Sequence, residues 1–199
     1  MANKDAAFGL RPARMMNGSA FMNQQNRYRI ANNDSTAIFQ GDMVEALTAG
    51  VVARMAAGDG GFVLGVFNGC RYTDPTTGKE TFSNSYPGSI AADDIEAFVI
   101  DAPYAKFEIQ ADDTVNDDDI AANCALVQGT SNATLGISRV SLDISTAATT
   151  AALPIRIVDW KGGYDGDEKG TAYPIMLCKF NTGHQLGIGA VSGNAPSAA

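Results

Sequence analysis

The feature that most constrains this chain is the regular interruption of its apolar runs. From Tyr28 onward it consists of short apolar or alternating runs, such as "IEAFVIDAP", "LPIRIVDW" and "YPIMLCKFN". Turn residues separate these runs, including Gly41-Asp42 and Gly162-Gly163. Many short strands bounded by Gly, Asn, Asp and Pro are typical of all-β sandwiches and barrels. We therefore predict an all-β protein, with a compact β-sandwich or β-barrel-like body, long loops and an extended N-terminal arm.

Helical signals are few. In "NDDDIAANCALV", Asn116 suits an N-cap and three aspartates follow it, where carboxylates favour the positive end of a helix dipole. This pattern predicts a turn or two of helix. The small residues of "STAATTAA" (145–152) predict a linker or loop, because they offer little side chain to pack. At most one or two short helices are expected.

The length of 199 residues and the mass of 20.8 kDa suit one well-buried domain. We expect an extended arm over residues 1–27, here called the leader, and a β-rich body over 28–190. A small second lobe is expected around 112–168. Residues 191–199, rich in Ser and Ala, are expected to form a flexible tail.

The charge pattern bears on partners. The net charge of -8 disfavours nucleic acid, because phosphate binding needs a basic surface. The leader is the only basic segment of the sequence. The first 30 residues hold one acidic residue, Asp5, and five basic ones: Lys4, Arg11, Arg14, Arg27 and Arg29. No apolar run reaches 18 residues and no signal-peptide pattern opens the chain, so no membrane contact is expected.

The sequence holds no recognisable cofactor or metal motif. Cys70, Cys124 and Cys178 stand singly without a CxxC pair, and this spacing predicts buried free thiols made in a reducing cytosol. Neither a phosphate-binding GxxxxGK[ST] loop nor a GxGxxG motif between a strand and a helix is present. We therefore expect no cofactor.

Catalysis is not expected either. His184 is the one histidine, with no GxSxG elbow or second histidine beside it, so we interpret it as structural. The acidic stretches 111–119 and 164–170 are interpreted as solvated loops. A glycosidase carboxylate pair, or a calcium ion on Asp165, Asp167 and Glu168, are weaker alternatives.

The leader holds large apolar side chains that follow neither helical nor strand spacing. One interpretation is that it folds back on its own domain as an irregular strand. The other is that it straps a neighbouring subunit, through apolar anchors and arginines that donate hydrogen bonds. The candidate partner-binding residues are Phe8, Leu10, Arg11, Arg14, Met15 and Phe21. The strap interpretation expects that removal of residues 2–20 leaves a folded body.

Three segments resemble small virion proteins of tailed bacteriophages that decorate or cement the head: "ANKDAAFGLRPAR", "IFQGDMVEALTAGVVARMAAGDGGFVLGVFNGCRYTD" and "NTGHQL". The middle segment is similar to a decoration-protein pattern of a "GD-x-V" strand, a hairpin and a strand ending in "GV". The resemblance implies a β-rich capsid decoration protein on the outer surface of the virion, made in the host cytoplasm. It also implies a homotrimer that bridges major capsid protein subunits, with Ala2 to Arg14 as the strap.

Two other functions remain open. A carbohydrate-binding module for host adhesion would need exposed aromatic side chains, for which Tyr72, Tyr86, Trp160 and Tyr164 are the candidates. Another head or tail structural component would share the all-β body. An enzyme ranks last, because the aspartates and glutamates form no recognisable catalytic pair.

Overall fold

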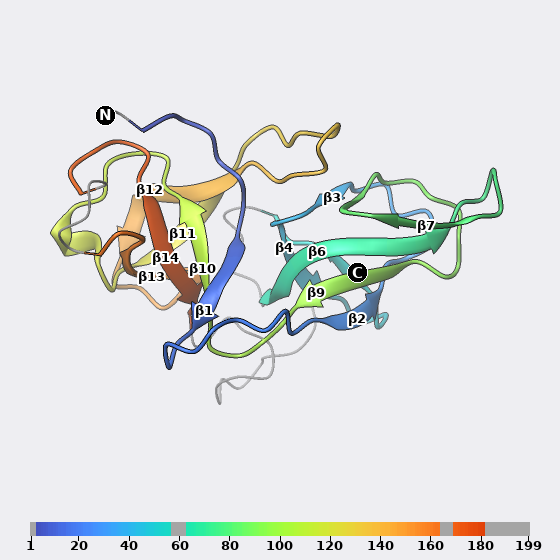
Figure 1. Ribbon diagram of the computed structural model, residues 1–199, viewed down its shortest axis with the longest axis horizontal. Helices are drawn as coiled ribbons and strands as arrows, with labels where there is room; N and C mark the ends of the chain where they lie inside the picture. The colour runs from blue at the N-terminus through green and yellow to red at the C-terminus, as the bar shows by residue number, and fades with distance from the viewer. Residues whose placement is uncertain (1–2, 57–62, 164–168, 182–199) are drawn as a thin grey trace.

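The computed structural model describes residues 3–56, 63–163 and 169–181, and within these ranges the protein is all-β, as predicted (Figure 1). Fourteen strands are joined by loops, and the helical structure described is one 3-10 turn, Asp117–Asp119. The Asn116 side chain accepts from the Asp119 backbone, and Asp119 accepts the Asn116 N–H at 2.8 Å. The capping signal was therefore correct, although the turn is short.

One lobe is a barrel-like sheet of six strands. All neighbours pair antiparallel, in the order β1 (Arg11–Met15), β10 (Ala105–Gln110), β14 (Ile175–Phe180), β13 (Ile155–Trp160), β11 (Asn123–Gln128) and β12 (Val140–Ala148). The sheet curls because β12 returns to the end of β10, where Ala111 bridges Leu142 and the Asp112 N–H donates to the Leu142 carbonyl at 3.0 Å. We call this part the barrel lobe.

The other lobe contains the second six-stranded sheet. Its strands run in the order β2 (Asn26–Arg29), β9 (Glu96–Ile100), β6 (Val63–Thr73), β4 (Met43–Ala46) and β5 (Val52–Arg54), and β7 (Glu80–Ser83) pairs with β6. A short pair, β3 (Ile38–Phe39) and β8 (Ser85–Tyr86), accompanies it. We call this part the β6 lobe, after its longest strand.

Inward-pointing and outward-pointing side chains alternate along the strands, and the inward-pointing ones form the cores. In β13, for example, Ile155 and Ile157 point inward and are fully buried, while Arg156 between them is partly exposed. The larger core fills the barrel and continues into the β6 lobe, because Met43, Val66 and Ile100 belong to it. A separate core around Phe67 and Tyr86 stabilises the far part of the β6 lobe. The two lobes therefore share apolar packing at their junction.

The start of the chain lies in that junction. The Gly9 N–H donates to the carbonyl of Val140 in the barrel lobe at 3.2 Å, and the Leu10 N–H donates to the carbonyl of Gly41 in the β6 lobe at 2.9 Å. Leu10 is 2% exposed and belongs to the shared core. The chain then enters β1, which pairs with β10. Residues 8–10, 40–42 and 136–140 together form what we call the seam.

A loop from the barrel lobe also crosses the seam. The Ser138 N–H donates to the Gln40 carbonyl at 3.0 Å, and the Gln40 N–H donates to the Gly136 carbonyl at 3.1 Å. Further out, Asn84 donates to the Leu135 carbonyl at 2.7 Å. The connection between β11 and β12 therefore fastens the barrel lobe to the β6 lobe independently of the leader.

The Gly41-Asp42 turn is the β6-lobe side of the seam. Asp42 is fully buried, and its Oδ2 accepts the Phe39 N–H at 2.9 Å, which closes the turn. Burial raises the pKa of this carboxyl above its ordinary value, although bonds from Ser138 and Phe39 oppose the rise. The Gly41 carbonyl takes no part in closing this turn and instead accepts the Leu10 N–H of the leader.

Of the two interpretations of the leader, the structure bears out the one in which it folds back on its own domain: residues 11–15 form β1, because β10 offers an open strand edge and Leu10 anchors the approach in the core. One local expectation was wrong. Residues 145–148 were expected in a linker or loop but continue β12, since pairing to β11 supplies backbone bonds that small side chains do not oppose. The stretch that carries the predicted helical turn passes into β11, whose Cys124 and Leu126 are buried. Pairing with distant strands determined the structure of these segments.

The division into lobes also differs from the expected one. The barrel lobe takes up the chain from Ala105 and includes β1, whereas the second lobe was expected around 112–168. The loss of Leu10 and β1 argues against a folded body after removal of residues 2–20. The expected tail 191–199 and His184 lie outside the described residues, as do Tyr164, Asp165, Asp167 and Glu168.

The seam predicts a graded cost for two glycine substitutions. Gly9 has φ of 72°, and an added Cβ would lie 2.8 Å from the Gly41 carbonyl oxygen and 2.7 Å from the Ser138 Cβ. Gly18 has φ of 85° but an added Cβ would meet nothing within 4 Å. Both alanine variants carry left-handed strain, so Gly9→Ala should be less stable than Gly18→Ala by about 1–3 kcal/mol from the clash. Urea unfolding measures this, and equal stabilities would contradict the seam geometry.

The burial of Leu10 predicts a second difference. Leu10→Ala should lower the free energy of unfolding by about 2–5 kcal/mol, because it opens a cavity in the shared core. Leu135→Ala is the matched control, since this side chain is 58% exposed and its loss should change stability by about 0.5 kcal/mol or less. The same urea curves measure both. A Leu10→Ala variant as stable as the control would show that the leader is not part of the core.

Candidate partner-binding surface

The structure places the six predicted leader residues in three different settings. Leu10 is in the core and cannot contact a partner while the fold is intact. Met15 and Phe21 pack against that core and are only partly exposed. Arg11 and Arg14 are exposed on β1, and Phe8 is partly exposed where the chain enters the seam. The two arginines and Phe8 are therefore the predicted residues that remain available for binding.

Phe8 and Arg11 form one unit at the mouth of the seam. The Arg11 guanidinium carbon lies 4.2 Å from the centroid of the Phe8 ring, a cation–π contact that orients both side chains. They line a groove of about 410 Å³, whose other walls include Gln40, Asn68 and Ile137. The Gln40 amide donates to Asn68 at 2.9 Å, which fixes the polar rim of the groove. The groove could accept a single side chain of a partner.

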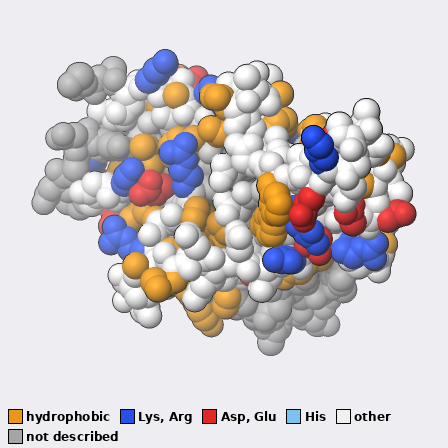
Figure 2. Space-filling view, turned by 45° about the vertical axis from the view of Figure 1, so that its right-hand side comes forward, with side chains coloured by type: hydrophobic (Ala, Val, Ile, Leu, Met, Phe, Trp, Pro, Cys, Tyr) orange, Lys and Arg blue, Asp and Glu red, His pale blue; other side chains and the backbone are white. Residues whose placement is uncertain are grey.

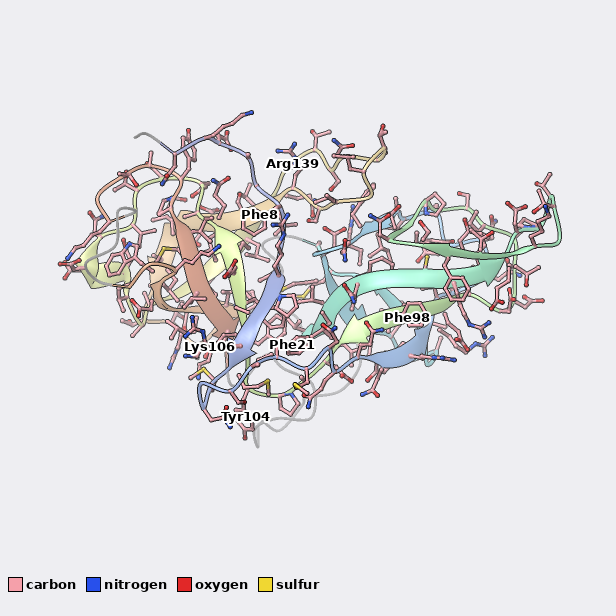
Figure 3. The ribbon with its side chains drawn as sticks, in the orientation of Figure 1. Phe8, Phe21, Phe98, Tyr104, Lys106 and Arg139 are labelled. Atoms are coloured by element: carbon pink, nitrogen blue, oxygen red, sulfur yellow. The ribbon has the colours of Figure 1, made fainter. Side chains whose placement is uncertain are left out.

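Phe8 also lines a smaller hollow. It has a volume of about 170 Å³ and is lined in part by Phe8, Arg11, Leu135 and Arg139. Figure 3 shows Phe8 and Arg139 close together beside the β11–β12 loop. Leu135 is 58% exposed on this loop. The Phe8 and Arg11 side chains of the leader thus line both hollows.

The far end of β1 forms a compact apolar end surface. The Met15 N–H donates to the Ser19 carbonyl at 2.9 Å, which closes a tight turn, and the Met16 N–H donates to the Tyr104 carbonyl at 2.8 Å. Tyr104 is 63% exposed and Met22 is 78% exposed. Figure 3 shows Phe21, Tyr104 and Lys106 at this same end of the molecule. Exposed aromatic and methionine side chains on a rigid mount are typical of protein interfaces.

Tyr104 was missed by the sequence reasoning. It adopts φ of 67°, a left-handed conformation that is uncommon for a residue with a bulky side chain. The signal available was the "DAPYAK" turn between two strong strands, which puts an aromatic residue at an exposed connection. An aromatic residue held outward in a strained turn, at a cost of about 1–3 kcal/mol, favours a binding role.

The aromatic residues considered for carbohydrate binding do not form a surface platform. Tyr72 is 8% exposed, Tyr86 is 0% exposed and Trp160 is 2% exposed. Tyr86 donates from its hydroxyl to the Asp34 carbonyl at 2.9 Å, as expected of a core tyrosine. These three side chains stabilise the cores, so they cannot stack on a sugar.

Other polar clusters have structural partners. Asp117 pairs with Lys169, with Nζ 2.8 Å from Oδ1. Within the described ranges, no group of three or more His, Cys, Asp or Glu side chains is arranged to hold a metal ion. The same part of the chain has no helix long and apolar enough to cross a membrane.

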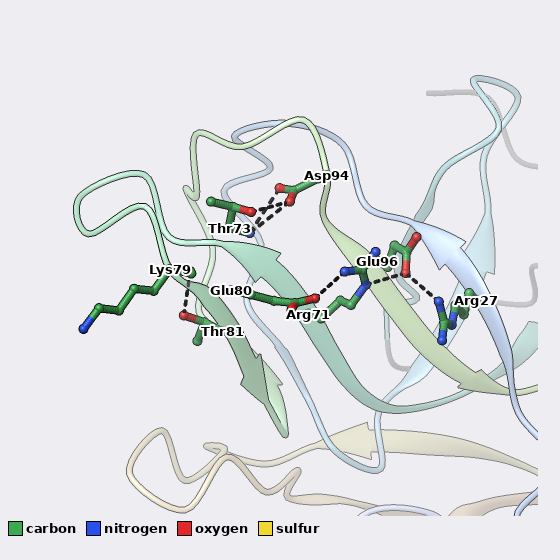
Figure 4. Close-up of polar contacts among 8 residues, drawn as sticks. All are labelled: Arg27, Arg71, Thr73, Lys79, Glu80, Thr81, Asp94 and Glu96. Atoms are coloured by element: carbon green, nitrogen blue, oxygen red, sulfur yellow. Dashed lines mark hydrogen bonds and ion pairs between the residues drawn. The ribbon is translucent and has the colours of Figure 1, made fainter.

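The largest ion-pair network lies at the end of the β6 lobe (Figure 4). Arg71 on β6 bonds Glu96 on β9, with Nε 2.8 Å from Oε2, and also bonds Glu80 on β7. The Thr73 hydroxyl donates to Asp94 at 2.6 Å. The bond from Arg71 lowers the pKa of Glu96, and those from Thr73 lower the pKa of Asp94. Arg27 on β2 also pairs with Glu96, with Nη1 3.6 Å from Oε2, so the network joins four neighbouring strands and we interpret it as structural.

The three cysteines are free and buried, as predicted. Burial raises the pKa of Cys70 and of Cys124 to about 12, and it raises the pKa of Cys178 as well. The thiolate is the reactive form, so these thiols should be inert in the folded protein.

A thiol titration tests this interpretation. At mildly alkaline pH the folded protein should not react with DTNB, whereas in denaturant all three thiols should react. The two samples differ only in folding, so the denatured one is the control. Rapid reaction of a native thiol would show that one of the lobes opens readily.

Comparison with known proteins adds no family assignment: no protein-family model matches the chain, and neither a curated protein nor a solved structure is significantly similar to it. A function has to be inferred from the surface itself. That surface consists of two arginines and Phe8 on the leader, the turn after β1, and the exposed Tyr104.

Proposed function

We propose that this protein is a structural virion protein that decorates and cements the outer surface of a tailed-phage head. It would bridge major capsid protein subunits and stabilise the head against internal pressure. The resemblance of three segments to head decoration proteins motivates the proposal. The observation that carries it is the mounting of the leader, which is anchored by Leu10 in the core and by β1 in the sheet while Arg11 and Arg14 stay exposed.

Such a mounting suits a cement function for an energetic reason. Binding groups on a rigid strand lose little conformational entropy when a partner binds them, so more of the contact energy appears as affinity. A protein present in many copies on a symmetric shell also gains from multivalent contact, even when each contact is weak. Self-association, most simply as a homotrimer, would link several shell subunits through one particle.

The chemistry of the surface fits a protein partner. Tyr104 and Met22 offer exposed apolar area, and the neighbouring arginines offer forked donors for carboxylates and carbonyls. Carbohydrate adhesion is the second candidate, but burial of Tyr72, Tyr86 and Trp160 removes the platform it needed. A structural protein at another position on the virion would use the same surface. The part of the virion to which the protein binds distinguishes this alternative from head decoration.

Binding to isolated heads of the phage that encodes the chain tests the proposal. Wild-type protein should co-sediment with heads, and Tyr104→Ala should weaken binding about tenfold or more, as expected of an interface hot spot. Phe82→Ala is the matched control, because Phe82 is an equally exposed aromatic residue, at 66%, on the β6 lobe. Its affinity should stay at the wild-type value. Absence of wild-type binding to heads, with binding to tails or to host glycans instead, would contradict the proposal.

A further inference from the structure

Four cations form a row across the outer wall of the barrel lobe. Arg14 on β1 lies directly opposite Lys106 on β10, and Arg156 on β13 lies directly opposite Lys179 on β14. Strands β10 and β14 are neighbours, so the two pairs continue one another. We call Arg14, Lys106, Lys179 and Arg156 the cation row.

The alternation of the strands fixes the direction of these side chains. Phe107 pairs with Cys178, and Cys178 pairs with Ile157; all three are buried in the barrel. Lys106 and Lys179 are the adjacent residues on β10 and β14, so they point to the opposite, outer face. Arg14 is exposed and the other three members are partly exposed. All four therefore lie on the outer wall.

The row works against the stability of the isolated fold. Neighbouring strands are about 4.7–4.9 Å apart, and like charges directly opposite one another are destabilising. In the part of the chain that the structure describes, no member of the row forms an ion pair with a carboxylate. Arg156 bonds the neutral Asn123 side chain at 2.9 Å. Among the described residues, the repulsion is therefore not offset by an ion pair to any member of the row.

The adjacent positions on the outer wall carry acidic as well as basic side chains. Glu108, opposite Arg11, pairs with Lys161, with Nζ 3.0 Å from Oε2. Asp159 lies on the same wall, opposite Leu177. Figure 2 shows Lys and Arg side chains gathered around an acidic one on this lobe. The row is thus a local concentration of positive charge in a protein of net charge -8.

We propose that the cation row is a docking site for an acidic patch on a partner protein. The identity of that partner rests on the proposed function, under which it is the outer surface of the major capsid protein. Charge complementarity supplies the reason: carboxylates of a partner would neutralise four cations that form no ion pair within the described ranges. Lys106 also lies at the same end of the molecule as Tyr104 (Figure 3), so one partner could contact both the row and Tyr104.

A protein fits this site better than a nucleic acid. A phosphate backbone carries closely spaced negative charge along its whole length. On leaving the row it would meet Glu108 and Asp159 on the same wall, in a molecule of net charge -8. A folded partner can place a few carboxylates on the row and present neutral or basic groups elsewhere.

Charge reversal separates a binding role from a structural one. In the double variant Lys106→Glu with Lys179→Glu, each new glutamate faces Arg14 or Arg156, so its melting temperature should be equal to or above that of wild type. Its binding to heads should fall about tenfold or more. The control is Arg29→Glu with Lys79→Glu, which makes the same change in net charge on the β6 lobe and should bind like wild type. In wild type, added salt should weaken binding.

A second probe keeps the test independent of the capsid assignment. Wild-type protein should bind poly-L-glutamate at low salt, and the Lys106→Glu, Lys179→Glu variant should lose this binding while the control keeps it. Binding of poly-L-glutamate by a protein that ignores heads would support the row and contradict the proposed function. Equal binding of heads or poly-L-glutamate by the reversal variant and wild type would overturn the row. Preferential binding of duplex DNA would also overturn it.

Discussion

The two lobes depend on a short stretch of backbone that bonds to both of them. Gly9 and Leu10 donate to carbonyls on opposite sides of the seam, and the Leu10 side chain enters the core that the lobes share. Without this stretch, the barrel lobe would lose β1 and the Gly41 carbonyl would lose its donor. Hydrogen bonds of this kind contribute about 0.5–1.5 kcal/mol each, and a buried leucine about 1.5–3 kcal/mol. The leader is therefore a structural element of its own chain.

That constraint determines what the leader can offer a partner. Its apolar anchor is used internally, so binding falls to the groups that the anchoring leaves outside: Phe8, Arg11 and Arg14. β1 also places Arg14 opposite Lys106, which adds a leader residue to a row that three other strands continue. A fold that brings like charges together at some cost to its stability suggests a partner that neutralises them. The proposed cement function and the proposed docking site follow from the same pairing.

Much of this fold could be predicted from the sequence. Turn residues between short apolar runs gave the all-β class, and alternation such as that of "LPIRIVDW" marked β13. The elements that could not be predicted are those made by pairing distant segments. β1 has no period of its own and forms because β10 accepts it, and β11 lies in a stretch that also suits a helix. Local patterns do not specify which edges meet.

The binding surface was predicted less completely for the same reason. Arg11 and Arg14 were identified because the leader is the basic segment of the sequence. Lys106, Arg156 and Lys179 are single charges in separate strands, and only strand order and register bring them together. Each lies between apolar residues in the sequence, so its outward position could be predicted, but the row that the three form with Arg14 could not. A cryo-EM map of the phage head carrying this protein tests the account most directly. The account predicts density on the outer surface, with β1 paired to its own β10 and the Lys106 and Tyr104 end facing the shell. Density on the tail, or a leader lying across a neighbouring subunit, would contradict it.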